Sequence, residues 1–401
     1  MKKKVVKQGI ICGCLILMIG ILVAGKGANK DDLKEESDLK EYNLPIEEQI
    51  QETAENDCVE KMELIYDIYK AADKGEASNV SLSEETIYQM VGILKETGIP
   101  VTASGLFWDM YNYEEVEKFL ESAKKGESGE IVIYDVLYSG GIVRRQFEAE
   151  GTDMHVLESI ATWNGENSAL TLTSTYTRIK EWKYTDKGWF CYKLCVPEYP
   201  DTTEIVDGSK LLRIKPMNAE NRKATDKYVR GLCYQGNNVL CSNWDSGSLE
   251  ILDYNGVYEY LYEMEYGEIM DSELCVNGIP AEEFEKLIMK YFPLTKEQIR
   301  QYAIYDEESQ TYPWISLGCS NYAPSFFGTS FPEVTNIKEN DDGTLTLTVD
   351  AVCEMIFCDD AVITHELTVR VQEDGSFQYL GNKILGDGME RIPEYEYRIT
   401  R

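Results

Sequence analysis

The residue types that most often perform chemistry in proteins are sparse in this chain. There are two histidines, His155 and His365. The run His365-Glu366-Leu367 lacks the second histidine of the zinc-hydrolase motif H-E-x-x-H, and it lies in a segment with the pattern of a strand. No G-x-S-x-G, Walker or dinucleotide-binding glycine motif occurs. The sequence therefore predicts no metal and no cofactor, and it favours a protein that is not an enzyme.

His365 is nevertheless a candidate ligand-binding residue. In the segment 361–371, Ile363, His365, Leu367 and Val369 alternate with polar residues and so share one face of a predicted strand. If that face lines a pocket, the imidazole points into it. The alternative interpretation is a hydrogen-bonded histidine in the core. The sequence leaves both open.

Carboxylates are so abundant that their presence alone indicates nothing. The chain has 71 Asp and Glu, whereas a glycoside hydrolase needs two carboxyl groups at a set separation. Some pair will lie close together by chance. A cell-wall or glycan hydrolase that uses a carboxylate pair is therefore kept as the alternative function.

Aromatic residues are concentrated in a loop between Thr311 and Pro332 that also contains several prolines. Tyrosine and tryptophan suit carbohydrate and peptide surfaces, because they bury a large area with little loss of entropy and keep a polar tip. A glycan, peptide or protein partner at the outer surface is one expectation, and a loop that plugs the second sheet or packs between domains is the other. The candidate ligand-binding residues of this loop are Tyr312, Trp314, Tyr322, Phe326 and Phe327.

Eleven cysteines are present, and no C-x-x-C occurs among them. Cys233 and Cys241 lie symmetrically about Gly236-Asn237-Asn238. If these three residues form a tight hairpin loop, the two cysteines face one another across the strands. They are therefore the candidate disulfide.

The first 27 residues have the pattern of a signal or anchor segment. Lys2, Lys3, Lys4 and Lys7 precede an uncharged apolar run from Gly9 to Gly25, and basic residues stay on the cytoplasmic side of a membrane. We expect a cell-membrane protein with a single N-terminal span and the bulk of the chain extracytoplasmic. Secretion after cleavage near Val23-Ala24-Gly25 is the alternative, and a lipid anchor at Cys14 is a weaker one.

The net charge of −32 limits the partners. So acidic a chain is repelled by nucleic acid and by anionic wall polymers unless its charges are locally arranged. Residues 28–44 are polar and highly charged, which is typical of a tether between membrane and folded part. We therefore expect no nucleic-acid partner and a membrane contact through the N-terminal segment.

The rest of the chain is too long for one ordinary core, and its periodicities indicate two domains. In each half, segments with helical spacing come before segments that alternate like strands and are separated by glycine turns. We predict an α+β fold with curved antiparallel β-meanders. The expected boundaries are 45–215 for the first domain, 216–250 for a linker with a hairpin, and 251–401 for the second domain.

The two halves end alike. Gly188-x-Phe190-x-Tyr192 matches Gly375-x-Phe377-x-Tyr379, and each follows an acidic turn. Helices followed by a meander that ends in such a strand resemble the NTF2-like (cystatin-like) α+β cone fold. This resemblance implies two tandem cones, whose concave faces are pockets or packed cores.

The chain as a whole resembles the membrane-tethered extracytoplasmic proteins of Gram-positive anaerobes that form domain families of unknown function. The leader and the run DGTLTLTVDAV…HELTVR carry this resemblance. It implies a location but no chemistry. Together with the lack of catalytic motifs, it favours a non-catalytic, membrane-tethered binding or interaction module.

Overall fold

The computed structural model describes residues 41–399 apart from 76–79, 106–107, 165–168, 272–273, 318–326 and 355–359. The predicted leader and residues 28–40 of the predicted tether lie outside this range. None of the helices described combines the length and the apolar composition that a membrane crossing requires. The chain forms two compact units. The first unit runs to Met217 and includes Glu354–Asp360, and the second contains Asn218–Cys353 and the residues from Ala361 onward.

In the described part of the first unit the helices are α2 (Glu48–Ala71), α3 (Glu84–Lys95) and α4 (Glu114–Ala123). In α2, residues at helical spacing such as Cys58, Met62 and Ile65 are buried. Helix α3 begins after Ser83, whose hydroxyl accepts a hydrogen bond from the backbone N–H of Thr86. Periodicity and capping therefore determine where these helices form.

The first unit contains a seven-stranded sheet in which the strands follow one another in chain order. All neighbouring strands pair antiparallel except β1 and β2, which are parallel and are connected through α4. The expected antiparallel meander does not include this parallel pair. The strands are β1 (Val101–Ala103), β2 (Gly129–Val136), β3 (Ile142–Glu150), β4 (Asp153–Asn164), β5 (Ala169–Tyr184), β6 (Trp189–Leu194) and β7 (Ser209–Arg213).

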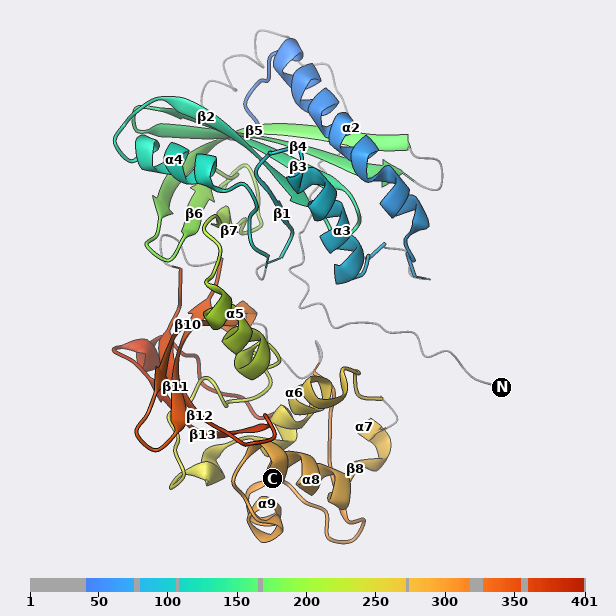
Figure 1. Ribbon diagram of the computed structural model, residues 1–401, viewed down its shortest axis with the longest axis vertical. Coiled ribbons are helices and arrows are strands. Elements are labelled where there is room, and N and C mark those ends of the chain that lie inside the picture. Colours follow the sequence, from blue (N-terminus) through green and yellow to red (C-terminus); the bar gives the residue numbers. More distant parts are fainter. Residues whose placement is uncertain are drawn as a thin grey trace. The chain divides into compact units, whose positions relative to one another are not determined.

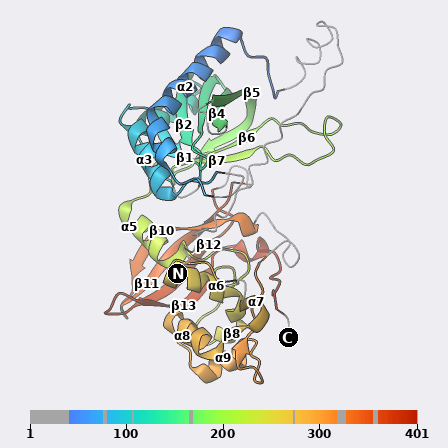
Figure 2. The same ribbon diagram turned by 90° about the vertical axis from the view of Figure 1, so that its right-hand side faces the viewer.

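Helices cover both faces of this sheet, because successive strand residues point to opposite sides. Tyr134 and Val136 of β2 pack against α2 and α3 on one face, and Figure 2 shows these two helices side by side there. Ile133 of β2 and Phe147 of β3 pack against α4 on the other face. The sheet thus separates two cores (Figure 1).

The second unit combines helices with a four-stranded antiparallel sheet in the order β10-β11-β12-β13 and a two-stranded pair, β8-β9. Its helices are α5 (Ala219–Ala224), η2 (Thr225–Val229), η3 (Leu249–Ile251), α6 (Tyr254–Tyr266), α7 (Leu274–Asn277), α8 (Ala281–Tyr291), α9 (Lys296–Tyr302), η4 (Phe327–Thr329) and η5 (Gly388–Glu390). Its strands are β8 (Ile279–Pro280), β9 (Thr311–Tyr312), β10 (Phe331–Glu339), β11 (Thr344–Val352), β12 (Thr364–Val371) and β13 (Phe377–Ile384).

The predicted α+β class with curved sheets is confirmed. The predicted linker with a hairpin over residues 216–250 is wrong. The chain enters α5 and η2 there and continues without strands into a segment with a buried core that includes Leu232, Val239 and Leu240. Asn238 holds this segment in place, because its side chain donates to the carbonyl of Ile251 and accepts from the N–H of Asp253. Side-chain hydrogen bonds hold this segment in place of strand pairing. Such bonds leave no alternating pattern in the sequence, so the structure of the segment could not be predicted from periodicity.

Candidate functional site

The aromatic rings of the loop between Thr311 and Pro332 are buried wherever the structure describes them. Tyr312 is fully buried and its ring stacks on Phe284, with 3.9 Å between centroids. Trp314 is 5% exposed and donates from its Nε1 to Glu259 at 3.0 Å. Phe327 is also buried. The described rings therefore favour the packing interpretation over an accessible recognition surface, while Tyr322 and Phe326 lie outside the described residues.

His365 is buried in a closed hydrogen-bond network. The side-chain Nδ2 of Asn382 donates to the carbonyls of Leu240 and Ser242 at 3.2 and 2.9 Å, so its Oδ1 accepts from His365 Nδ1 at 2.6 Å. The other ring nitrogen, Nε2, accepts from the hydroxyl of Tyr234 at 2.8 Å. The imidazole is thus neutral with both nitrogens satisfied, as expected of a core histidine.

The predicted disulfide is absent. Neither Cys233 nor Cys241 is joined in a disulfide. Cys233 Sγ lies 3.1 Å from the carbonyl oxygen of Gln235, and Cys241 Sγ lies 3.7 Å from that of Asn237. The prediction was wrong because no strands flank residues 236–238, so the symmetric spacing does not place the thiols across a hairpin.

One carboxylate pair is brought together in the first unit. Arg145 and Glu158 are direct cross-strand partners in β3 and β4, with Nε and Oε2 2.9 Å apart. Arg145 NH1 lies 3.1 Å from Asp135 Oδ2, and Ser104 donates to the other oxygen of Asp135. Burial raises the pKa of Asp135, although Arg145 and Ser104 oppose the shift. The guanidinium is bound to both carboxylates, so it occupies the place that a scissile glycosidic bond would need between them.

An open hollow of about 350 Å³ lies on the first unit, where the end of α4, the β3–β4 turn and the end of β5 meet. This volume is at the lower end of the range for small-molecule sites, about 300–1,000 Å³. It is lined by Ala123, Lys124, Gly126, Gly151, Thr152, Trp182, Lys183 and Tyr184. A rigid strand supplies the aromatic part, and two glycine turns form the rim.

Trp182 is the half-buried aromatic wall of the hollow, and its ring lies edge-on against the buried Phe190 at 6.0 Å. Tyr184 is buried beside it and donates to Glu117 at 2.9 Å, and burial is the largest cause that raises the pKa of this tyrosine. Lys124 Nζ lies 5.0 Å from the centroid of the Tyr184 ring. Lys183 also borders the hollow, but it lies between Trp182 and Tyr184 in β5, so its side chain points to the other face of the strand.

The hollow can therefore hold a ligand that presents one flat, apolar face and a hydrogen-bonding or anionic group. The ring of Trp182 suits the face, and the ammonium group of Lys124, which also lies 2.9 Å from Glu121, suits the polar group. Sequence reasoning missed these residues. The available signal was the run Lys180-Glu181-Trp182-Lys183 at a strand end, but such runs also occur on ordinary exposed strands.

Comparison with known proteins gives a single result. The model of a family of unknown function, DUF6070, matches residues 51–398. No curated protein and no solved structure matches the chain. Over the described residues, no group of three or more His, Cys, Asp or Glu side chains is placed to hold a metal ion.

Replacing Trp314 tests whether the aromatic loop is a packing element. Trp314→Ala should lower the free energy of unfolding of the second unit by about 3–5 kcal/mol, because it removes a buried ring and leaves Glu259 with one partner fewer. Ile315→Ala is the matched control, since its side chain is 44% exposed, and it should stay within about 0.5 kcal/mol. Urea unfolding of the variants measures both. A small loss for Trp314→Ala, together with a ligand that this variant no longer binds, would restore the recognition interpretation.

The buried imidazole should make the second unit sensitive to acid. Burial lowers the pKa of His365 from 6.5 to about 4, although the hydrogen bond with Asn382 opposes the shift. Between these values the unfolded chain binds a proton that the folded chain does not, so stability falls as the pH drops from about 6.5 to 4, by up to about 3 kcal/mol. Hydrogen exchange of the β12 and β13 amides in urea, at several pH values, measures this. His365→Gln should be less stable at pH 7 yet show a flatter dependence, and equal slopes would contradict the prediction.

Proposed function

We propose that this chain, which belongs to DUF6070, a family of unknown function, is a non-catalytic binding module. The proposal rests on the geometry of its polar side chains. Its N-terminal segment would display the module outside the membrane. The observation that supports this most is the contrast between its two kinds of polar site. The groups with catalytic chemistry, His365 and the Asp135–Arg145–Glu158 cluster, are occupied by one another or by neighbouring protein groups. The hollow beside Trp182 is open to a ligand.

A glycan hydrolase is the second candidate. Asp135 and Glu158 differ in exposure, with side chains 7% and 31% exposed, and burial raises the pKa of the former. Two carboxyl groups in different environments are the arrangement that hydrolysis requires. Arg145 would first have to leave its position between them, which would strand a buried cation. For this reason binding is the better supported function.

The resemblance to the NTF2-like fold, the tether and the membrane-anchored origin are also proposals. The order of helices, sheet and packed concave face in the first unit supports an NTF2-like cone. The charged N-terminal region supports a tether. A membrane-anchored origin among Gram-positive anaerobes rests on the leader and on the strand sequences given above.

Replacing Trp182 tests whether the hollow binds a ligand. Soluble peptidoglycan fragments and neutral and acidic oligosaccharides would be screened against the protein by saturation-transfer NMR. For any ligand found, Trp182→Ala should raise the Kd by roughly tenfold or more, because the ring supplies the buried contact area. Tyr199→Ala is the control, since its side chain is 85% exposed on another loop and is not part of the hollow.

The same samples test the alternative. Each ligand would be analysed by chromatography after long incubation with the protein. Intact ligand together with a Trp182-dependent Kd supports the binding module. Cleavage that disappears in Glu158→Gln would replace it with the hydrolase.

Protease treatment of intact cells tests the location. We expect added protease to degrade residues 45–401, because the basic residues before the apolar run retain the N-terminus on the cytoplasmic side. A chain without residues 1–27 is the control and should remain protected inside the cell. Protection of the full-length chain in intact cells, with digestion after lysis, would overturn the proposed location.

A further inference from the structure

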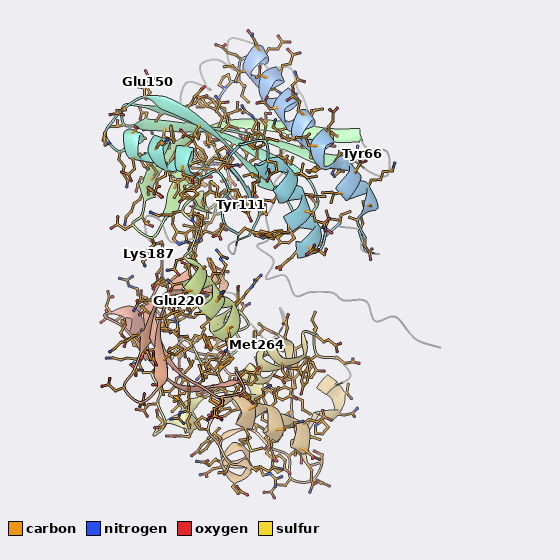
Figure 3. The ribbon with its side chains drawn as sticks, viewed as in Figure 1. Tyr66, Tyr111, Glu150, Lys187, Glu220 and Met264 are labelled. Atoms are coloured by element: carbon orange, nitrogen blue, oxygen red, sulfur yellow. The ribbon has the colours of Figure 1, made fainter. Side chains whose placement is uncertain are left out.

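Four aromatic side chains gather at one edge of the first unit, beside α3 and on the opposite face of the sheet from α4. They are Tyr88 of α3, Trp108 and Tyr111 from the segment after β1, and Tyr138 from the β2–β3 turn. The Tyr111 hydroxyl donates to the Tyr88 hydroxyl at 3.1 Å, and Trp108 Nε1 donates to the Tyr138 hydroxyl, also at 3.1 Å. The rings of Tyr88 and Trp108 are 6.0 Å apart. Figure 3 labels Tyr111 in this region.

The backbone holds these rings in fixed positions. Tyr111 and Val101 exchange two backbone hydrogen bonds of 2.8 and 3.1 Å. The next residue, Asn112, has a φ of 55° and donates from its side chain to the carbonyls of Lys95 and Ile99. Lys95 Nζ in turn lies 4.7 Å from the centroid of the Tyr111 ring. Rings held in this way lose little entropy when a ligand binds.

Tyr88 is the most exposed of the group, with 57% of its surface accessible, while Trp108, Tyr111 and Tyr138 are partly buried. A single exposed tyrosine needs no explanation, because surface apolar residues are common. These four rings differ from scattered residues in that hydrogen bonds and ring contacts join them into one surface. We name this surface, made by Tyr88, Trp108, Tyr111 and Tyr138, the aromatic platform.

The position of Gly92 supports a binding role for the aromatic platform. It lies one helical turn after Tyr88, on the same flank of α3 as Tyr88 and Lys95. A Cβ at Gly92 would meet no other heavy atom within 4 Å, so neither packing nor close approach requires glycine. Glycine is among the poorest helix formers, and Gly92, the ninth of the 12 residues of α3, weakens the last turn of that helix. The fold gains nothing from the missing side chain, whereas a ligand beside Tyr88 gains space.

We propose that the aromatic platform binds a neutral oligosaccharide, whose sugar rings stack on Tyr88 and extend over Gly92. Sugars present apolar C–H faces ringed by hydroxyls, which match aromatic rings that carry O–H and N–H groups at their edges. The Tyr88 hydroxyl accepts from Tyr111 and so directs its own proton outward as a donor. The net charge of −32 disfavours acidic polymers. This site is independent of the hollow, because α3 and α4 pack on opposite faces of the sheet.

Substitutions on α3 test the proposal in the full-length chain. The probes are cellohexaose, maltohexaose and chitohexaose, with hexagalacturonate as the acidic comparison, measured by calorimetry. Tyr88→Ala should weaken binding of the preferred neutral sugar by about tenfold or more. Gly92→Gln should weaken it similarly while raising the Tm by about 2 °C or more, because glutamine is a far better helix former than glycine. Ile93→Gln places the same side chain on the opposite flank and should leave the affinity unchanged.

The Tm and the sugar affinity of Gly92→Gln, measured together, test whether the glycine preserves space for a ligand. A variant at Gly92 that melts higher and binds less well shows that the glycine preserves space for the ligand. Equal affinity of Gly92→Gln and the unaltered chain would overturn the proposal, as would the absence of binding to all three neutral sugars. Stronger binding of hexagalacturonate than of every neutral probe would overturn the ligand class.

Discussion

The ion pair between Glu259 and Arg398 is the interaction on which the second unit most depends. Arg398 is 3% exposed in its side chain and lies 2.9 Å from Glu259 of α6. Its guanidinium also donates to the carbonyls of Gly236, Gly256 and Ile315. One side chain near the end of the chain therefore holds together the irregular segment before α6, the start of α6 and the aromatic loop. Burial raises the pKa of Glu259, and the charge of Arg398 with the hydrogen bond from Trp314 opposes that shift. Removal of the arginine would leave a buried carboxylate with too few partners.

The need to pair a buried carboxylate with a basic side chain recurs in both units, because the chain has 71 acidic residues and 39 Lys and Arg. A buried carboxylate needs a cation or several donors, and basic residues are the scarcer kind. In the second unit, Glu285 is 1% exposed and binds Arg300 at 2.6 Å. In the first unit, Arg144 of β3 binds Asp57 of α2 at 3.0 Å, which fixes the helix on the sheet. The reactive groups are thus largely committed to stability. For that reason the binding sites proposed above are the hollow and the aromatic platform, which include the partly exposed rings of Trp182 and Tyr88.

Local signals predicted most of the fold and little of the site. The buried residues of α2 recur at helical spacing, and Thr295 and Gln298 form a capping box at the start of α9, so both helices carry a local signal in the sequence. Strand β1 has three residues and no periodicity, so its parallel pairing with β2 depends on packing that no local pattern records. The aromatic loop was identified by composition, which cannot distinguish a buried ring from an exposed one. The hollow is assembled from three separated segments, each ordinary by itself, so only the folded chain reveals it.

The burial of Cys58 and Cys241 has a consequence for the chemistry of the protein. Burial raises the pKa of Cys58 and of Cys241 to about 12. The thiolate is the reactive form, so a raised pKa lowers its population at neutral pH. These cysteines would react slowly with oxidants and with foreign disulfides while the fold is intact. Both side chains would therefore keep the same covalent form as the redox potential of the surroundings changes.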